Sequence, residues 1–295
     1  MRAAVALALG AVLSASSGLA APVPPAPPAS ESTTVQEITV TAPAEAKAVA
    51  QFVDAITAPT TAGRVARWDR KVCPGVLGLK PEAGNFLNDT IARVAYEVGL
   101  EVGEPGCKPN IIVFVTPESD TFTSEIVANR PAAFAKYNAG GSKAGRGRNA
   151  LKSFVETPKA VRWWHVVETV GADGQPLSGE DKSVRVRDAS RLRSNVRDDF
   201  SRVIVVVDAK RIQGVRFGAI ANYLAMVTLA QISPDAEAKG SGTILTLFAD
   251  RDAGIEPETK LTERDVAYLR GLYSTDPSAK NAARAKNQIG SSMRR

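Results

Sequence analysis

The strongest hydrophobic pattern in the chain lies between residues 201 and 273. It opens with five consecutive β-branched residues, Val203 to Val207, which predict a buried strand. The uncharged residues 217–234 follow and are apolar nearly all round, which predicts a buried central helix. Residues 261–273 then repeat apolar positions at helical spacing and predict a closing helix. We expect these three elements to form the centre of the fold.

Three segments upstream of this centre also place apolar residues at helical spacing. The predicted helices are residues 45–56, 81–100 and 121–137. Pro131 breaks or restarts the third helix, because proline lacks the backbone N–H that a helix interior needs. In the second helix, Phe86 and Leu87 belong to the apolar side, so we expect both to face the core. Residues 190–202 are polar and basic, which indicates a surface helix that leads into the following strand.

Strand composition recurs in two more places. Residues 110–115 and 161–170 are rich in β-branched or aromatic residues and predict two further strands. Residues 171–174 predict a hairpin turn, and residues 183–187 a return strand. The mixture of helices and strands indicates an α/β (α+β) fold in which helices pack on a mixed sheet.

The length of 295 residues allows one large domain or two modest ones. We expect a single α/β domain over residues 45–277. The alternative is an N-terminal subdomain over residues 45–140 and a zincin-like part, defined below, over residues 150–277. Either arrangement buries a real core, since 44% of the residues are hydrophobic and 23% are charged.

The two ends of the chain differ in composition from this domain. Residues 1–20 combine Arg2, a short apolar core and small residues before a cleavage site, so they predict a signal peptide. That core is too short to remain as a membrane span, and residues 217–234 are too polar for one. Residues 21–44 form a Pro/Ala-rich linker. Residues 278–295 carry five basic residues and no acids, which predicts a disordered basic tail.

Cys73 and Cys107 are the only cysteines, and Gly and Pro lie close to both. A disulfide between them suits an oxidising compartment and would stabilise the fold by roughly 3–4 kcal/mol. The alternative is two separate buried thiols. Together with the signal peptide, this pair leads us to expect an exported protein, in the periplasm or outside the cell.

Basic residues outnumber acidic ones, and the net charge is +6. Because positive and negative residues are interleaved along the chain, this charge indicates a solvated mixed surface. The alternative is contact with an anionic surface or an envelope protein. We expect no nucleic-acid partner. The basic loop 140–148 contains Gly140 and Gly145, but Arg146 and Gly147 stand where a P-loop needs Lys and then Ser or Thr. A nucleotide-binding loop is therefore excluded. What remains is a solvated loop, or one that contacts an anionic surface or substrate.

Histidine limits the possible chemistry, because the chain has only one, His165. A zinc-peptidase motif such as His-Glu-x-x-His needs two imidazoles on one helix face, so it is absent. A serine triad would have to use His165, and the chain lacks the Gly-x-Ser-x-Gly motif. The adjacent acids at 180–181 and 198–199 do not converge on one bond as glycosidase acids do. We expect His165 to be a packed strand residue, and we expect no catalytic residue, metal or cofactor. The alternative for His165 is a metal site that it shares with carboxylates.

A short segment near the mature N-terminus, residues 35–43, alternates in the manner of a strand. Its central residues are Glu37, Ile38, Val40 and Thr41. They resemble the TonB box of TonB-dependent outer-membrane receptors, which implies pairing as an added strand with the energy-transducing partner. The rest of the chain cannot supply the receptor barrel. The alternative is an incidental edge strand or a tether.

The closing helix carries a second resemblance. Its matching positions are Leu261, Thr262, Asp265, Leu269, Leu272 and Tyr273. With the preceding strand, the central helix and residues 245–250, they resemble the closing half of metzincin-type zinc peptidases. In that family an edge strand precedes the zinc helix and a Met-turn segment follows it. The resemblance implies a zincin-like C-terminal half, and Thr262 with Asp265 can cap its closing helix.

The chain departs from this family where the zinc ligands would stand. Asn222 and Met226 lie four residues apart on the central helix, with Tyr223 beside them. Neither Asn nor Met replaces an imidazole on zinc, so the resemblance implies a degenerate site and carries over no catalytic residue. The whole pattern, including the sequences around Cys73 and Cys107, is similar to a secreted family of Gram-negative bacteria. That similarity implies no activity.

Three hypotheses about function follow. The first is an exported, non-catalytic protein with a binding or envelope-associated structural role, built on a zincin-like fold without zinc ligands. The second is an atypical hydrolase, directed at peptides or glycans, which would need a pocket with convergent acids of shifted pKa. The third is an accessory protein that docks to the TonB system through residues 35–41.

Overall fold

The computed structural model describes residues 42–134, 145–175, 193–236, 240 and 242–295. These residues belong to one compact unit that extends from Val40 to Arg295. The predicted signal peptide, most of the linker, the TonB-box-like segment and the return strand expected at 183–187 lie outside the described residues. Within the described part of the chain, helices pack on a four-stranded mixed sheet, so the expected α/β class is confirmed.

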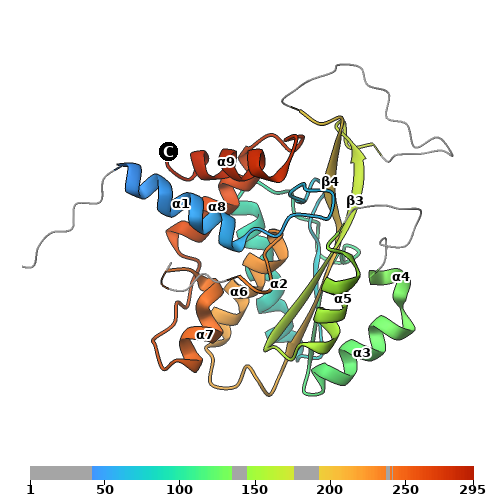
Figure 1. Cartoon of the computed structure of the whole chain (residues 1–295). Helices are drawn as coiled ribbons and strands as arrows, with labels where there is room; N and C mark the ends of the chain where they lie inside the picture. The colour runs from blue at the N-terminus through green and yellow to red at the C-terminus, as the bar shows by residue number, and fades with distance from the viewer. Residues whose placement is uncertain (1–41, 135–144, 176–192, 237–239, 241) are drawn as a thin grey trace, which may run out of the picture. The chain divides into compact units, whose positions relative to one another are not determined.

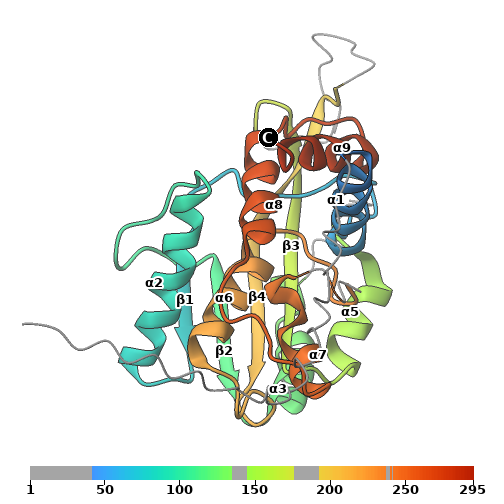
Figure 2. The same ribbon diagram turned by 90° about the vertical axis from the view of Figure 1, so that its left-hand side faces the viewer.

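The sheet has the strand order β1-β2-β4-β3. Its strands are β1 (Pro74–Leu77), β2 (Ile111–Thr116), β3 (Val161–Gly171) and β4 (Val196–Asp208). β1, β2 and β4 run parallel, whereas β3 runs antiparallel to β4 and forms one edge (Figure 2). In β4, Val205 lies opposite Val113 on one side and Trp163 on the other. The β-branched run suits this interior position, because both faces of the strand are buried.

Helices cover both faces of this sheet (Figure 1). On one face lie α2 (Pro81–Glu97), α6 (Phe217–Leu229) and α8 (Glu263–Ser274). On the other face lie α3 (Ser119–Asn129), α4 (Pro131–Phe134) and α5 (Gly147–Glu156). The remaining helices are α1 (Ala42–Ile56), η1 (Ile244–Thr246), α7 (Leu247–Asp252) and α9 (Ala282–Ser292). In the described part of the chain, none is both long and apolar enough to span a membrane.

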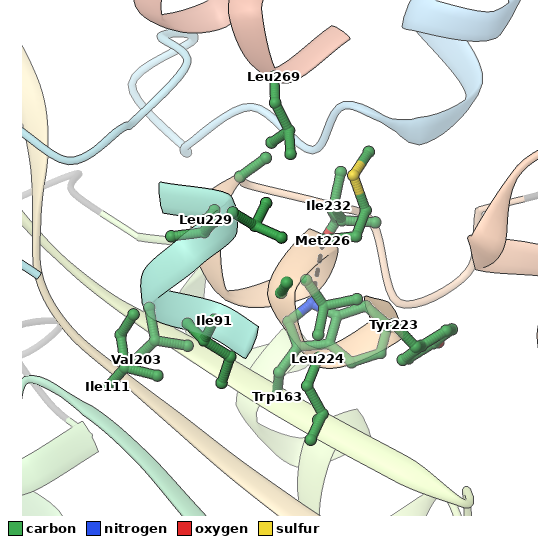
Figure 3. Packing of buried hydrophobic residues seen from close by; sticks show 14 of the residues in the cluster. Ile91, Ile111, Trp163, Val203, Tyr223, Leu224, Met226, Leu229, Ile232 and Leu269 are labelled. Carbon is green, nitrogen blue, oxygen red and sulfur yellow. Dashed lines mark hydrogen bonds between the residues drawn. The ribbon is translucent and has the colours of Figure 1, made fainter. Parts of the chain in front are cut away.

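Two hydrophobic clusters fill the space between the sheet and its helices. The larger one joins α6 to the sheet, and Figure 3 shows Leu224, Met226 and Leu229 of α6 at its centre. The smaller one lies against α4 and α5 on the opposite face. β3 contributes to both clusters, because Trp163 and Trp164 point to opposite faces, as successive strand residues do.

β4 begins at Val196, so part of the surface helix expected at residues 190–202 is strand instead. The prediction rested on polar composition, but Arg197, Asp198 and Asp199 are buried and paired rather than solvated. Asp198 alone accepts hydrogen bonds from three side chains of the neighbouring loop and strand. Composition cannot distinguish a strand whose charges are satisfied inside the protein from a solvated helix.

The C-terminal residues 278–295, for which the sequence predicts a disordered basic tail, contain α9 instead. Asn281 caps this helix with its side chain, and Ile289 is fully buried between α8 and α1. Lys286 forms an ion pair with Asp54 of α1 at 3.0 Å. α9 has so few apolar residues that its composition resembles that of a solvated tail.

One apolar residue of α2 and the strand β1 also differ from the prediction. Phe86, expected in the core, is 47% exposed and contacts Phe217, whereas Leu87 is buried as expected. β1 itself was not predicted, because it opens with Pro74 and Gly75, which are rare inside strands. Pro74 is tolerated because β1 is the other edge of the sheet and this residue is the first of the strand.

A disulfide joins Cys73 and Cys107, whose Cα atoms are 6.2 Å apart. It links the segment before β1 to the segment before β2, so it closes the unit made of β1 and the crossover that contains α2. Gly103 packs directly against this bond, since a Cβ at that position would lie 2.7 Å from Sγ of Cys107. The predicted cysteine pairing is confirmed.

Candidate functional site

Four ring side chains close the C-terminal end of α6, the helix that the resemblance aligns with a zinc helix. Each donates a hydrogen bond to a backbone carbonyl in the last turn of α6 or just after it. The pairs are His165 Nε2 with Val227 (2.9 Å), Trp68 Nε1 with Thr228 (2.9 Å), Trp163 Nε1 with Ile232 (3.1 Å) and the Tyr273 hydroxyl with Leu229. Figure 3 shows the Trp163 bond. The rings therefore take the role of a helix C-cap.

His165 is buried in this cap and stacks on Phe200, with ring centroids 4.7 Å apart. Burial lowers the pKa of His165 to about 4, outweighing the hydrogen bond to Val227, so the imidazole is neutral at neutral pH. Its Nε2 proton is committed to a backbone carbonyl. His165 is therefore the packed strand residue that the sequence predicts.

The residues at the three degenerate positions are held by contacts within the protein. The Asn222 amide donates to two backbone oxygens, at 2.8 and 3.4 Å. Met226 is fully buried in the larger cluster. Tyr223 packs edge-on against Trp163 and Phe248, and burial raises the pKa of its hydroxyl. An amide, a core thioether and a neutral phenol do not fit zinc, and no described residues form a group of three His, Cys, Asp or Glu placed to hold a metal.

A cleft of about 540 Å³ opens beside Tyr223, between the start of β3, α6 and α7. We call it the β3 cleft. Trp163, Tyr223 and Phe248 provide aromatic surface, and Pro158 and Pro234 add apolar surface. Its volume falls within the roughly 300–1,000 Å³ of sites that bind small molecules. Of the three α6 positions that the resemblance marks, Tyr223 lines this cleft.

The cations around the β3 cleft are engaged by carboxylates. Lys159 Nζ lies 2.9 Å from Asp235, and Arg251 lies 2.7 Å from Asp252. Arg211 pairs in the same way with carboxylates of α3 and β4. The lining is therefore aromatic, with cations that already pair with carboxylates, which suits an apolar or aromatic group.

Two buried acids have shifted pKa values, and neither lines the β3 cleft. Burial raises the pKa of Asp199 to about 6, although its ion pair with Arg197 opposes the shift. Burial acts in the same direction on Asp208, but hydrogen bonds from Ser119 (2.6 Å) and from backbone N–H groups outweigh it and lower the pKa. Of the described residues, Asp252 is the one acid that lines the cleft. The convergent acids that the hydrolase hypothesis needs are not among them.

Comparison of the chain with protein-family models, with curated proteins and with solved structures finds no significant match. The function is therefore argued from the geometry. The TonB-box-like residues Glu37, Ile38, Val40 and Thr41 lie outside the described residues, so docking through them remains a prediction.

Sequence reasoning singled out Tyr223 but missed the aromatic partners that surround it. Trp163 and Phe248 are 60 and 25 residues from Tyr223 in the chain, and only the packing of β3 and α7 beside α6 brings them together. One signal was available: adjacent residues of a strand face opposite sides, so one of Trp163 and Trp164 had to face the central helix.

Proposed function

We propose that the protein is an exported, non-catalytic binding protein whose C-terminal half is a zincin-like scaffold that does not hold zinc. The observation that carries this proposal is the β3 cleft, where aromatic surface replaces metal ligands beside α6. Export is supported by the predicted signal peptide and by the disulfide, since disulfides persist in oxidising compartments.

The order of the elements supports the zincin-like part of the proposal. β4 leads into α6, then η1 and α7 follow, and α8 comes last of the segments that resemble the family. Thr262 and Asp265 form a reciprocal capping box at the start of α8. Asp265 also accepts hydrogen bonds from the Thr243 hydroxyl and from the N–H of Ile244 (2.9 Å), so α8 holds the η1 turn in place. One feature differs: β4 is an interior strand, and the edge strand is β3.

The walls of the β3 cleft favour a ligand with an aromatic or flat apolar group. Tyr223 and Phe248 meet at 5.1 Å in an edge-on arrangement, and Trp163 meets Tyr223 at 6.1 Å. Added ring contacts of this kind contribute about 0.5–1.5 kcal/mol each beyond the burial of apolar area. Because the cations nearby are already paired, charge contributes little to recognition in this cleft.

Screening of aromatic fragments by ligand-detected NMR tests the proposal on the mature protein. Phe248→Ala removes part of the aromatic surface, and Phe86→Ala is the matched control because Phe86 is exposed and does not line the cleft. We expect saturable binding to the wild type and to the control, and about tenfold weaker binding to Phe248→Ala. Equal binding by all three proteins, or no binding, would contradict the proposal. Hydrolysis of a peptide or glycan by the purified protein would favour the hydrolase instead.

A further inference from the structure

A second, smaller pocket lies between the edge strand β3 and α5. Its volume is about 50 Å³, several times the roughly 10–15 Å³ that one water requires. Aromatic rings of Phe154, Trp163 and Trp164 form its apolar side. Arg146 and Lys159 line it as well, so cationic groups and rings share one small space. A cavity of this size accepts a group of a few heavy atoms rather than a nucleotide or a sugar chain.

The charges in this pocket do not balance. Arg146, Lys159 and Arg162 line it, and Asp235 is the one carboxylate that does so among the described residues. Arg162 is directed elsewhere, because its guanidinium is engaged with α3 and pairs with Asp120. Among the described residues, Arg146 and Lys159 therefore share a single carboxylate, which already lies 2.9 Å from the Lys159 Nζ. The same Nζ donates to the Pro234 carbonyl at 2.6 Å, so one of its three N–H groups is left for a ligand.

Arg146 stands immediately before α5 and is partly buried. Burial lowers the pKa of Arg146, and Asp235 opposes this shift only in part. Burial disfavours the charged form of Arg146, and the shared carboxylate compensates for this only in part. An added negative charge would therefore stabilise the cation. A hydroxyl group is also at hand, because Ser153 and Thr157 line the same wall. Their hydroxyl oxygens lie 3.2 Å apart, so one hydroxyl donates to the other and the second is left to donate to a ligand.

We propose that this pocket binds a compact oxyanion, a carboxylate or a phosphate group, through Arg146 and Lys159, with one hydroxyl of the Ser153–Thr157 pair as a further hydrogen-bond donor. Planar and tetrahedral oxyanions accept hydrogen bonds from guanidinium and ammonium groups at short distance. The pocket shares Lys159, Trp163 and Pro234 with the β3 cleft, but the proposal does not depend on ligand binding there. The sequence leaves open whether the basic loop 140–148 is solvated or contacts an anion. The proposal assigns an anion contact to Arg146 of this loop.

Titration of the ¹⁵N-labelled mature protein with sodium acetate and with sodium phosphate, at constant ionic strength set by sodium chloride, tests this assignment. The indole N–H signals report on the pocket, because Trp163 and Trp164 line it. We expect saturable shifts in the wild type and about tenfold or more weaker binding by Arg146→Gln, as for loss of a charged hydrogen-bond partner. Saturation by acetate alone identifies a carboxylate site, and saturation by phosphate alone identifies a phosphate site.

Lys152→Gln is the matched control, because Lys152 lies on the exposed side of α5 and the charge change is the same. If Arg146→Gln does not fold, Lys159→Gln replaces it and is expected to weaken binding in the same direction. Absence of saturation with both anions overturns the proposal. So does equal weakening by Lys152→Gln, since net charge and not the pocket would then govern the shifts.

Discussion

His165 and Asp199 are buried titratable side chains whose protonation acts on stability in opposite directions. Burial lowers the pKa of His165 to about 4, because it disfavours the imidazolium ion. Burial raises the pKa of Asp199 to about 6, because it disfavours the carboxylate. Protonation therefore favours the unfolded chain through His165 and the folded chain through Asp199. Between pH 4 and 6 the two effects offset each other, so single variants are needed to reveal them.

Replacement of His165 by Gln removes one of these titrations. The folded-state pKa is below the unfolded value, so the contribution of His165 is present above pH 6.5 and is lost as the pH falls towards 4. At pH 7 we expect His165→Gln to be less stable than the wild type by about 1–3 kcal/mol, through the lost hydrogen bond. At pH 4.5 that difference should shift by roughly 2–3 kcal/mol in favour of the variant. Urea unfolding at both pH values measures it, and an unchanged difference would contradict the account.

Asp199→Asn tests the opposite sign. The folded-state pKa is raised, so the wild type is stabilised below pH 3.8 and loses this contribution as the pH rises through 6. Because Asn does not ionise, the variant should gain roughly 2–3 kcal/mol relative to the wild type between pH 4 and 7.5. Denaturant unfolding at the two pH values checks this, with Asp89→Asn on the exposed surface of α2 as the control. If Asp199→Asn gained stability relative to the wild type at pH 4 and not at pH 7.5, the raised pKa of Asp199 would be contradicted.

Among the elements, α6 depends most on the rest of the chain. Its sequence is apolar on nearly every side, and its C-cap residue Ala230 has extended backbone geometry in place of a glycine turn. Its final carbonyls are satisfied by rings from β3, α8 and the loop before β1. The helix is therefore positioned by its neighbours at both the sheet and α8. This arrangement places Tyr223 at the β3 cleft.

α9 can be tested directly, because the sequence predicts a disordered tail where the structure has this helix. Ile289 is fully buried, and Gly271 of α8 allows the two helices to approach so closely that an added Cβ would lie 3.1 Å from the Ile289 carbonyl. We expect Ile289→Ala to lower the free energy of unfolding by about 2–4 kcal/mol. Asn287→Ala, at an exposed position of the same helix, is the control. Thermal and urea unfolding would show no difference between the two variants if the tail were disordered.

The elements that sequence patterns predicted are those with long apolar or β-branched runs, or with many apolar residues at helical spacing. The strands around Val113 and Val205 and the helices α2, α6 and α8 belong to this group. β1, the first half of β4, α5 and α9 were missed. β1 depends on its edge position and the first half of β4 on buried ion pairs, which no sequence period reveals, and α5 and α9 each bury only one or two large apolar residues among polar ones. For the site, the sequence pointed to Tyr223, but the facing residues Trp163 and Phe248 come from distant elements whose pairing no local pattern encodes.

In the fold as a whole, the disulfide fastens one edge of the sheet. β1 is a four-residue edge strand, and the bond between Cys73 and Cys107 fastens the segment before it to the segment before β2. The bridge closes a loop of 34 residues, and most of its effect falls on the unfolded chain.

Replacing both cysteines by Ser should therefore lower the free energy of unfolding by roughly 3–4 kcal/mol without changing the secondary structure. The wild type treated with a reducing agent should match the Cys73→Ser/Cys107→Ser variant. Urea unfolding followed by circular dichroism provides the measurement. Identical stability of the oxidised and reduced wild type would contradict a structural role for the bond.

Contacts within the protein itself engage Asn222, Tyr223 and Met226. We therefore infer that the scaffold binds its ligand without zinc. The most direct test of this claim is the zinc content of the mature protein, measured by plasma mass spectrometry after incubation with excess zinc and desalting. We predict far less than one zinc per chain, with no difference between the wild type and Asn222→Ala. One zinc per chain in the wild type, lost in Asn222→Ala, would contradict the claim.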